Sequence, residues 1–98
     1  MVAFARSMRP TLDVIIVNWN AGAWLARGLD ALARVRPTAG TLTRVVVVDN
    51  ASTDGSADAI DAHGLPLTII GNAVNRGFAA ACNQGAAAST ADVLLFLN

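Results

Sequence analysis

Charged residues are scarce in this sequence of 98 residues: they make up 14% of it, whereas hydrophobic residues make up 54%. Intrinsic disorder needs the opposite balance, low hydrophobicity with high charge, so it is excluded. Lysine and glutamate are missing altogether, and seven arginines against seven aspartates give a net charge of zero. The composition therefore does not indicate nucleic acid or an anionic membrane as a partner.

Cysteine is nearly absent as well. Cys82 is the only one, which excludes an internal disulfide and fits a reducing compartment. Its Ala-rich surroundings favour a small buried apolar residue over a nucleophile. No apolar run approaches the roughly 20 residues needed to cross a bilayer, and residues 1–10, expected to be irregular, hold no stretch long enough for a signal peptide. We therefore expect one small domain that is soluble or membrane-peripheral.

Four apolar, β-branched runs alternate with helical patterns along the chain. Continuous apolar runs of this length are typical of strands buried on both faces, as in parallel sheets. Strands are expected at residues 12–17, 43–48, 67–70 and 93–97, and helices at 23–34, 56–63 and 78–88. This alternation predicts an α/β fold of the Rossmann-like type, with a mostly parallel sheet and helices on both faces. The local pattern does not determine the order of the strands.

The expected helices carry more specific predictions. Trp24 is expected in the core, because it shares one apolar helical face with three leucines, Leu25, Leu29 and Leu32. Asn18 or Asn20 is expected to cap the start of the same helix. Asp58 should lie near the positive end of the helix at 56–63, and His63 at the surface.

Polar residues follow each apolar run, at the point where each expected strand ends. Ligands of parallel α/β sheets bind outside the carboxyl ends of the strands, so these polar residues are expected to line one cleft. They are residues 18–20, 49–50, 72–77 and Asn98. The sequence shows no cluster of metal ligands and no convincing nucleophile–base spacing.

Three residues of this cleft each have two interpretations. Asp49, held by a run of four valines, is suited to accept hydrogen bonds from a base or a ribose, and equally to cap the turn that follows. Trp19 either stacks on a base or sugar or covers the edge of the core. Gly77 permits close backbone approach at a helix N-terminus that favours negative charge, where Arg76 either contacts phosphate or is solvated.

Four motifs occur in a fixed order: VIIVNWNAGAWL, VVVVDNASTDGS, NRGFAAACNQG and ADVLLFLN. Each is weakly specific alone. Together, over residues 13–98, they strongly resemble the N-terminal segment of a family 2 glycosyltransferase with the GT-A fold. The pattern is most similar to the rhamnosyltransferase-type members, which build bacterial cell-surface polysaccharides. The resemblance implies that residues 1–98 are a single partial domain, the nucleotide-sugar-binding half of a GT-A fold truncated at Asn98.

The resemblance also implies roles for individual residues. Asp49 matches the acid that recognises the pyrimidine ring, and Trp19 stands where an aromatic residue packs on the base. Gly77 belongs to the family's N-x-G-F stretch beside the base, and Asn98 matches the first position of the family's D-x-D-like motif. The nucleotide-binding set implied in this way is Val17, Asn18, Trp19, Asn20, Asp49, Asn50, Gly77 and Asn98.

The catalytic residues implied by the resemblance lie outside these 98 residues. The acid that would hold Mg²⁺ or Mn²⁺ comes two positions after Asn98, and the catalytic base comes further on. For the complete enzyme the resemblance implies an inverting transfer from a dTDP- or UDP-sugar to a saccharide or lipid-linked acceptor, in the cytoplasm or at the inner face of the cell membrane. The cation would offset charge on the leaving diphosphate, and a carboxylate would deprotonate the acceptor.

Two other interpretations stay open. A dinucleotide-binding oxidoreductase would use Asp49 to bind a ribose, but the turn NWNAGAW lacks the G-x-G-x-x-G motif for pyrophosphate. A catalytically inactive fragment with at most weak nucleotide binding fits the 98 residues taken alone. Such a fragment is expected to be poorly soluble, because the apolar strand at 93–97 would form an exposed sheet edge.

Overall fold

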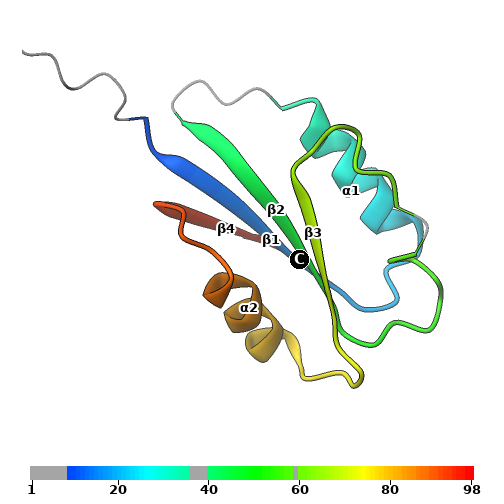
Figure 1. The fold of residues 1–98 in the computed structure, drawn as a ribbon. Helices are drawn as coiled ribbons and strands as arrows, with labels where there is room; N and C mark the ends of the chain where they lie inside the picture. Colours follow the sequence, from blue (N-terminus) through cyan, green and yellow to red (C-terminus); the bar gives the residue numbers. More distant parts are fainter. Residues whose placement is uncertain (1–8, 36–39, 59) are drawn as a thin grey trace, which may run out of the picture.

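The computed structural model describes residues 9–35, 40–58 and 60–98; residues 1–8 of the segment expected to be irregular lie outside this description. The strands are β1 (Thr11–Asn18), β2 (Thr41–Asp49), β3 (Leu67–Gly71) and β4 (Val93–Leu97), and the helices are α1 (Ala23–Ala33) and α2 (Phe78–Ala87). All strand pairings are parallel, in the order β3-β2-β1-β4. The predicted Rossmann-like α/β fold is confirmed, and so are the four strands (Figure 1).

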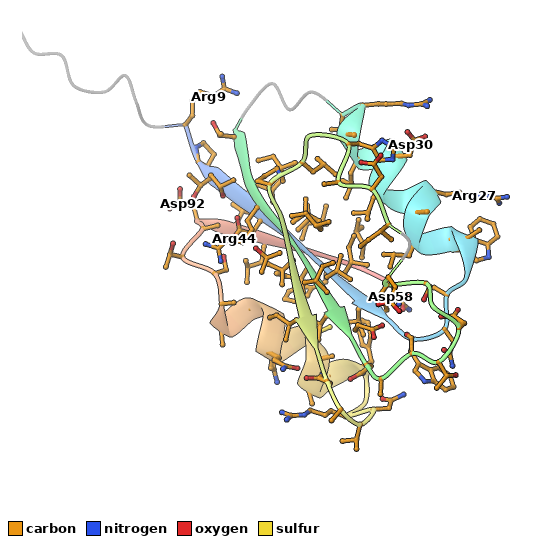
Figure 2. The ribbon with its side chains drawn as sticks, turned by 45° about the vertical axis from the view of Figure 1, so that its right-hand side comes forward. Arg9, Arg27, Asp30, Arg44, Asp58 and Asp92 are labelled. Atoms are coloured by element: carbon orange, nitrogen blue, oxygen red, sulfur yellow. The ribbon has the colours of Figure 1, made fainter. Side chains whose placement is uncertain are left out.

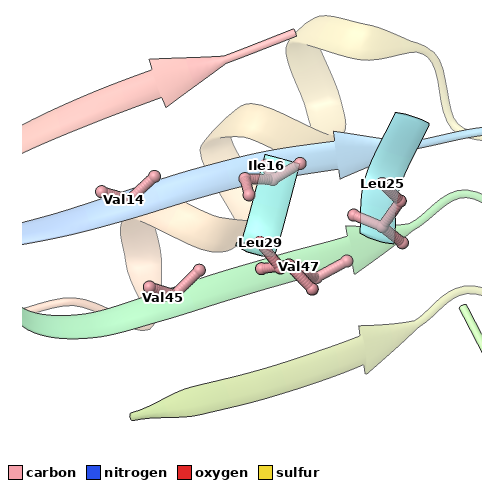
Figure 3. Close-up of a cluster of buried hydrophobic side chains, with 6 residues drawn as sticks. All are labelled: Val14, Ile16, Leu25, Leu29, Val45 and Val47. Atoms are coloured by element: carbon pink, nitrogen blue, oxygen red, sulfur yellow. The ribbon is translucent and has the colours of Figure 1, made fainter. Parts of the chain in front are cut away.

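The two helices cover opposite faces of the sheet, as the sequence predicted (Figure 1). Successive strand residues point to alternate faces, so each valine-rich strand feeds both cores. On one face, Leu25 and Leu29 of α1 pack on alternate residues of the two central strands, Val14, Ile16, Val45 and Val47 (Figure 3). On the other face, Ala81 of α2 packs against Ile15, Val46 and Val48. The central strands are therefore buried on both sides, which explains their unbroken apolar runs.

Helix α2 lies very close to the sheet because small residues face it. Gly85 is buried at this contact, and a Cβ added there would overlap the Cγ2 atom of Ile15. The far end of the helix is held by polar contacts. Arg44 Nη1 donates to the backbone oxygen of Ala88 at 2.7 Å, and Ser89 Oγ donates to buried Asp13 at 2.5 Å. Together these contacts determine where α2 crosses the sheet.

The outer strands β3 and β4 are less covered than the central pair. Ile69 of β3 is exposed, as are Val93, Leu95 and Phe96 of β4. The expectation that the strand at 93–97 forms an exposed sheet edge is confirmed for the described chain. The order of the strands, which the local pattern did not determine, follows from α2: the helix leads from β3 at one edge to β4 at the other.

Trp24 does not lie in the core, so that prediction was wrong. Its side chain is 72% exposed, and the guanidinium of Arg27, which projects outward from α1 (Figure 2), lies over its ring at 5.1 Å from the centroid. Consecutive helical residues are about 100° apart, and the buried stripe of α1 runs through Leu25 and Leu29. Trp24 therefore falls beyond the edge of that stripe.

The predicted helix at 56–63 is also wrong for the residues that the structure describes there. Residues 56–58 and His63 lie in turns, and residues 60–62 have no regular structure. His63 has a φ of 51°, and the flanking Gly55 and Gly64 have φ values of 75° and 80°. Such left-handed conformations are incompatible with a continuous right-handed helix. Asp58 is consequently not at a helix end; its backbone N–H donates to the oxygen of Gly55 in a turn.

Three predictions of side-chain exposure can be compared directly with the structure. His63 and Arg76 are exposed, as expected for solvated residues. Cys82 is half-buried rather than fully buried, since Ala81 and Gly85 form the inner face of α2. No helix among the described residues is long and apolar enough to span a membrane.

Candidate functional site

The carboxyl ends of the strands lie level with one another. Asn18 pairs with Asp49, and Asp49 pairs with Gly71, so the last residues of β1, β2 and β3 are in one row. Leu97 pairs with Ile16, which places Asn98 beside this row. The prediction that the polar residues after the strands gather at one edge is therefore confirmed.

Asn18 is the most buried polar residue of this edge, with 0% of its surface exposed. Its amide nitrogen Nδ2 lies 2.8 Å from Asp49 Oδ1, 2.9 Å from Ser56 Oγ and 3.1 Å from Ser52 Oγ. Its oxygen Oδ1 is buried without a hydrogen-bond partner among the described residues. The side-chain amide that the sequence assigned to the nucleotide is thus directed at the neighbouring loop.

The carboxylate of Asp49 is hydrogen-bonded unequally. Oδ1 accepts from Asn18 Nδ2 and from Ser52 Oγ at 2.6 Å, whereas Oδ2 accepts only a 3.3 Å bond from the backbone N–H of Ser52 among the described residues. Since a carboxylate oxygen has about two lone-pair sites, Oδ1 is fully used and Oδ2 is not. Asp49 therefore does cap its own turn, one of its two predicted roles, and keeps an oxygen for a ligand.

Two further contacts join the β1–α1 turn to the loop after β2. Asn20 Oδ1 accepts from the backbone N–H of Thr53 at 2.7 Å, and the N–H of Gly22 donates to Asp54 Oδ2 at 2.9 Å. The N-cap of α1 is Gly22, which makes no side-chain cap hydrogen bond. The prediction that Asn18 or Asn20 caps this helix was wrong, because both side chains bond across to the loop instead.

Asp54 gives this junction a pH dependence. Hydrogen bonds from Ser56, and one from the N–H of Gly22, lower the pKa of the exposed Asp54 carboxyl below its ordinary value. A lowered folded-state pKa means that the stabilisation is present above the unfolded-state value and is lost as the pH falls through the folded-state value. Asp54→Asn should therefore destabilise the chain by a constant amount near neutral pH, and this difference should shrink as the pH falls through the acidic range in which carboxylates take up protons.

Urea unfolding of both chains between neutral and strongly acidic pH would measure the effect of Asp54→Asn. Asp61→Asn is a matched control, since the Asp61 carboxylate accepts only a local bond from the N–H of His63 among the described contacts. A difference between Asp54→Asn and the unmodified chain that is independent of pH would contradict the assigned role.

Asn50 joins β2 to the segment before α2. Its side chain is only 2% exposed; Nδ2 donates to the backbone oxygen of Gly77, and Oδ1 accepts from Asn72 Nδ2 and from the backbone N–H of Arg76, each at 3.1 Å. Asn72 in turn exchanges two hydrogen bonds with Gln84 of α2. The amide of Asn50 is therefore occupied in holding the 72–77 loop.

A cavity of about 320 Å³ lies in front of these loops. Trp19, whose side chain is 58% exposed, and Phe78 supply its aromatic lining, and no atom would meet a Cβ placed on Gly77 within 4 Å. Gly77 thus needs to be glycine for its φ of 85° rather than for close packing. The lining residues are Val17, Trp19, Ala21, Asn50, Asn75, Gly77, Phe78 and Asn98.

A second cavity, of about 260 Å³, lies between α1 and β4. It is lined mainly by apolar residues, among them Trp24, Leu25 and Leu97, and it also borders Asn18. Of the eight residues predicted to bind nucleotide, five line the larger cavity and Asn18 borders the second. Asp49, at the end of β2, and Asn20, in the turn after β1, line neither cavity.

The described residues do not form a centre for a divalent cation. No group of three His, Cys, Asp or Glu side chains is placed to hold a metal within ranges 9–35, 40–58 and 60–98. At the edge formed by the strand ends, the carboxylates of Asp49 and Asp54 already accept hydrogen bonds from Asn18, Ser52, Ser56 and Gly22. No chemical step is therefore assigned to a metal on these residues.

The sequence did not reveal several residues that build this site. Ser52 and Asp54 were recognised only as parts of the turn after Asp49, and Ser56 only as the start of a predicted helix, although their side chains connect this loop to β1 and α1. The pairing of Asn72 with Gln84 joins residues 12 positions apart. A polar residue within an Ala-rich helix was the only available signal for Gln84.

A parallel sheet with polar loops and an aromatic-lined cavity at its carboxyl edge defines an α/β protein with a ligand site at that edge. A family model described as glycosyl transferase family 2 matches residues 13–98, and the chain belongs to this family. No curated protein matches the chain. Membership makes sugar transfer the general activity, with a nucleotide-sugar donor and an acceptor as substrates.

Proposed function

We propose that this chain binds the nucleotide of a UDP- or dTDP-sugar at the carboxyl edge of the sheet. The nucleotide would occupy the 320 Å³ cavity, and its base would extend past the lining residue Asn50 to the neighbouring Asp49, which does not itself line the cavity. Trp19 offers an exposed ring for stacking, and Gly77, in the lining of the same cavity, has open space where a Cβ would stand. Val17, Asn50 and Asn98 complete the lining. The observation that carries the proposal is the free lone-pair capacity of Asp49 Oδ2 at the end of a rigid, buried strand.

The chemistry of Asp49 favours uracil or thymine over cytosine. An ionised carboxylate only accepts hydrogen bonds. The preference holds for a base whose ring nitrogen N3 faces Oδ2: uracil and thymine carry a hydrogen on N3 and can donate it, whereas N3 of cytosine is itself an acceptor and only its 4-amino group can donate to a carboxylate. Such a charge-assisted hydrogen bond contributes about 1.5–3 kcal/mol, or roughly tenfold or more in affinity.

The finer features of the activity rest on the resemblance of the motifs. We propose a rhamnosyltransferase-type transfer to a saccharide or lipid-linked acceptor in bacterial cell-surface polysaccharide synthesis, in the cytoplasm or at the inner face of the membrane. The family often uses divalent cations, and we propose Mg²⁺ or Mn²⁺ for the complete enzyme, held by an acid beyond Asn98.

The second candidate is nucleotide binding without sugar transfer by the 98 residues alone. It is favoured by the contacts of the two acids at the site. Asp49 and Asp54 accept hydrogen bonds from Ser52 and Gly22 that hold the loops together, so both carboxylates have a role in the structure of the site. Incubation of the purified chain with UDP- and dTDP-sugars and a mixed acceptor set tests this candidate, and sugar transfer would refute it.

Calorimetric titration with UDP, dTDP and CDP tests the role of Asp49. We expect UDP and dTDP to bind the unmodified chain roughly tenfold or more tightly than CDP. Asp49→Ala should abolish this preference. Asp49→Asn should reverse it, because an amide that keeps Oδ1 on Asn18 and Ser52 presents its NH₂ to the base, and N3 of cytosine accepts from it.

Asp30→Ala is a matched control for loss of a carboxylate, since Asp30 forms a surface ion pair with Arg34 on α1. It should leave all three affinities unchanged. Equal binding of UDP by Asp49→Ala and the unmodified chain would refute base recognition by Asp49.

A further inference from the structure

The position of the Asp49 carboxylate is imposed by two neighbouring side chains. Asn18 Nδ2 and Ser52 Oγ both donate to Oδ1, at 2.8 and 2.6 Å, and Nδ2 also lies 3.1 Å from Ser52 Oγ. The three side chains therefore form a closed triangle of hydrogen bonds. Rotation of the carboxylate about its χ2 angle would break both short bonds.

The triangle is itself held firmly. Asn18 is fully buried at the end of β1, and it pairs in register with Asp49. The backbone N–H of Asn20, in the turn between β1 and α1, donates to Ser52 Oγ at 2.9 Å. The Ser52 hydroxyl therefore accepts a hydrogen bond from this turn while it donates one to Asp49. With its acceptor capacity used in this way, the hydrogen of Ser52 Oγ has Asp49 Oδ1 as its fixed partner.

We propose that Asn18 and Ser52 are positioning residues that orient Asp49, so that Oδ2 alone is presented to the base, and that they thereby set the preference for uracil or thymine. Neither side chain needs to touch the nucleotide. This assigns Asn18 a role different from the direct contact that the motif suggested, because the two hydrogens of its amide are shared among Asp49, Ser52 and Ser56. The inference rests on the proposed function of Asp49 in base recognition.

The preference for UDP over CDP distinguishes positioning from general stability. Ser52→Ala removes one short bond to Oδ1, so the carboxylate can rotate, and we expect the ratio of UDP to CDP affinity to fall by roughly fivefold, as for one hydrogen bond of about 1 kcal/mol. Ser52→Thr keeps the hydroxyl and should restore the ratio. Asn18→Leu, of similar shape but with neither donor nor charge, should lower the ratio as well, and it serves as the second variant.

Ser56→Ala is the matched control, because it removes another partner of Asn18 Nδ2 and leaves both short bonds to Asp49 in place. Urea unfolding should show similar losses of stability for Ser52→Ala and Ser56→Ala, whereas only Ser52→Ala lowers the ratio. An equal ratio in Ser52→Ala and the unmodified chain, or an equal fall in Ser56→Ala, overturns positioning while base recognition by Asp49 stands. An unmodified chain without any preference for UDP overturns both.

Discussion

Gly85→Ala is expected to lower the free energy of unfolding by about 2 kcal/mol. A Cβ at this position would overlap Ile15 Cγ2 and press on Val48 Cγ2, both in the buried centre of the sheet. Overpacking of a core costs about 1–3 kcal/mol, and here it outweighs the gain of up to about 1 kcal/mol from replacing a helical glycine. Helix α2 would have to move away from β1, because a branched core side chain has little freedom to rotate.

Gly28→Ala is the matched control for this effect. Gly28 also lies inside a helix, but nothing lies within 4 Å of a Cβ placed there. Only the helix-propensity term remains, so this variant should be stabilised by about 0.5–1 kcal/mol. Urea unfolding of the unmodified chain, Gly85→Ala and Gly28→Ala measures the two changes in the free energy of unfolding, which should have opposite signs. A stabilised Gly85→Ala would show that α2 does not pack on Ile15 as closely as the structure has it.

The sequence predicted helix α2, but it did not predict how closely this helix approaches the sheet. The Ala-rich pattern at residues 78–88 correctly predicted a helix, and the valine runs correctly predicted strands buried on both faces. These successes depend on local periodicity. Which strand neighbours which depends instead on the path of α2 across the sheet, and that path is determined by contacts such as Gly85 with Ile15 and Arg44 with Ala88.

The failed predictions of the cap of α1 and of the helix at 56–63 have one physical cause. Side chains of Ser, Asn and Asp can hydrogen-bond to the local backbone or to a distant partner, and composition does not say which. Here Asn18 and Asn20 bond to residues 31–38 positions away rather than capping α1. The side chain of Ser56 accepts a hydrogen bond from Asn18. The segment after Ser56 turns instead of forming the predicted helix.

The sequence predicted where the candidate site lies, but it did not predict which role each of its residues has. The rule that ligands bind at the carboxyl ends of parallel strands correctly brought Trp19, Asn50, Gly77 and Asn98 to one cavity. It does not separate side chains that face the cavity from those that hold its walls. Asn18 and Trp19 are adjacent in sequence, yet one is fully buried and the other is 58% exposed.

Asn50→Ala is expected to lower the free energy of unfolding by about 1–3 kcal/mol and to loosen the 72–77 loop. The substitution leaves the N–H of Arg76 without its described partner, and an unsatisfied group of this kind costs about 1–3 kcal/mol when buried. The oxygen of Gly77 loses one donor but still accepts from the N–H of Ala81. Water will reach part of this exposed loop, which limits the cost. Because Asn75 and Gly77 line the 320 Å³ cavity, affinity for UDP should fall together with stability.

Amide hydrogen exchange shows the local effect directly: the N–H of Arg76, bonded to Asn50 Oδ1 in the unmodified chain, should lose its protection in Asn50→Ala. Asn50→Asp should retain that protection, since a carboxylate still accepts from Arg76, but it should lose stability through repulsion between its oxygen and that of Gly77. Asn75→Ala, which removes only a local bond to the N–H of Gly77, is the control and should cost about 1 kcal/mol or less. Unchanged exchange at Arg76 in Asn50→Ala would mean that this loop is held by Asn72 and Gln84 rather than by Asn50.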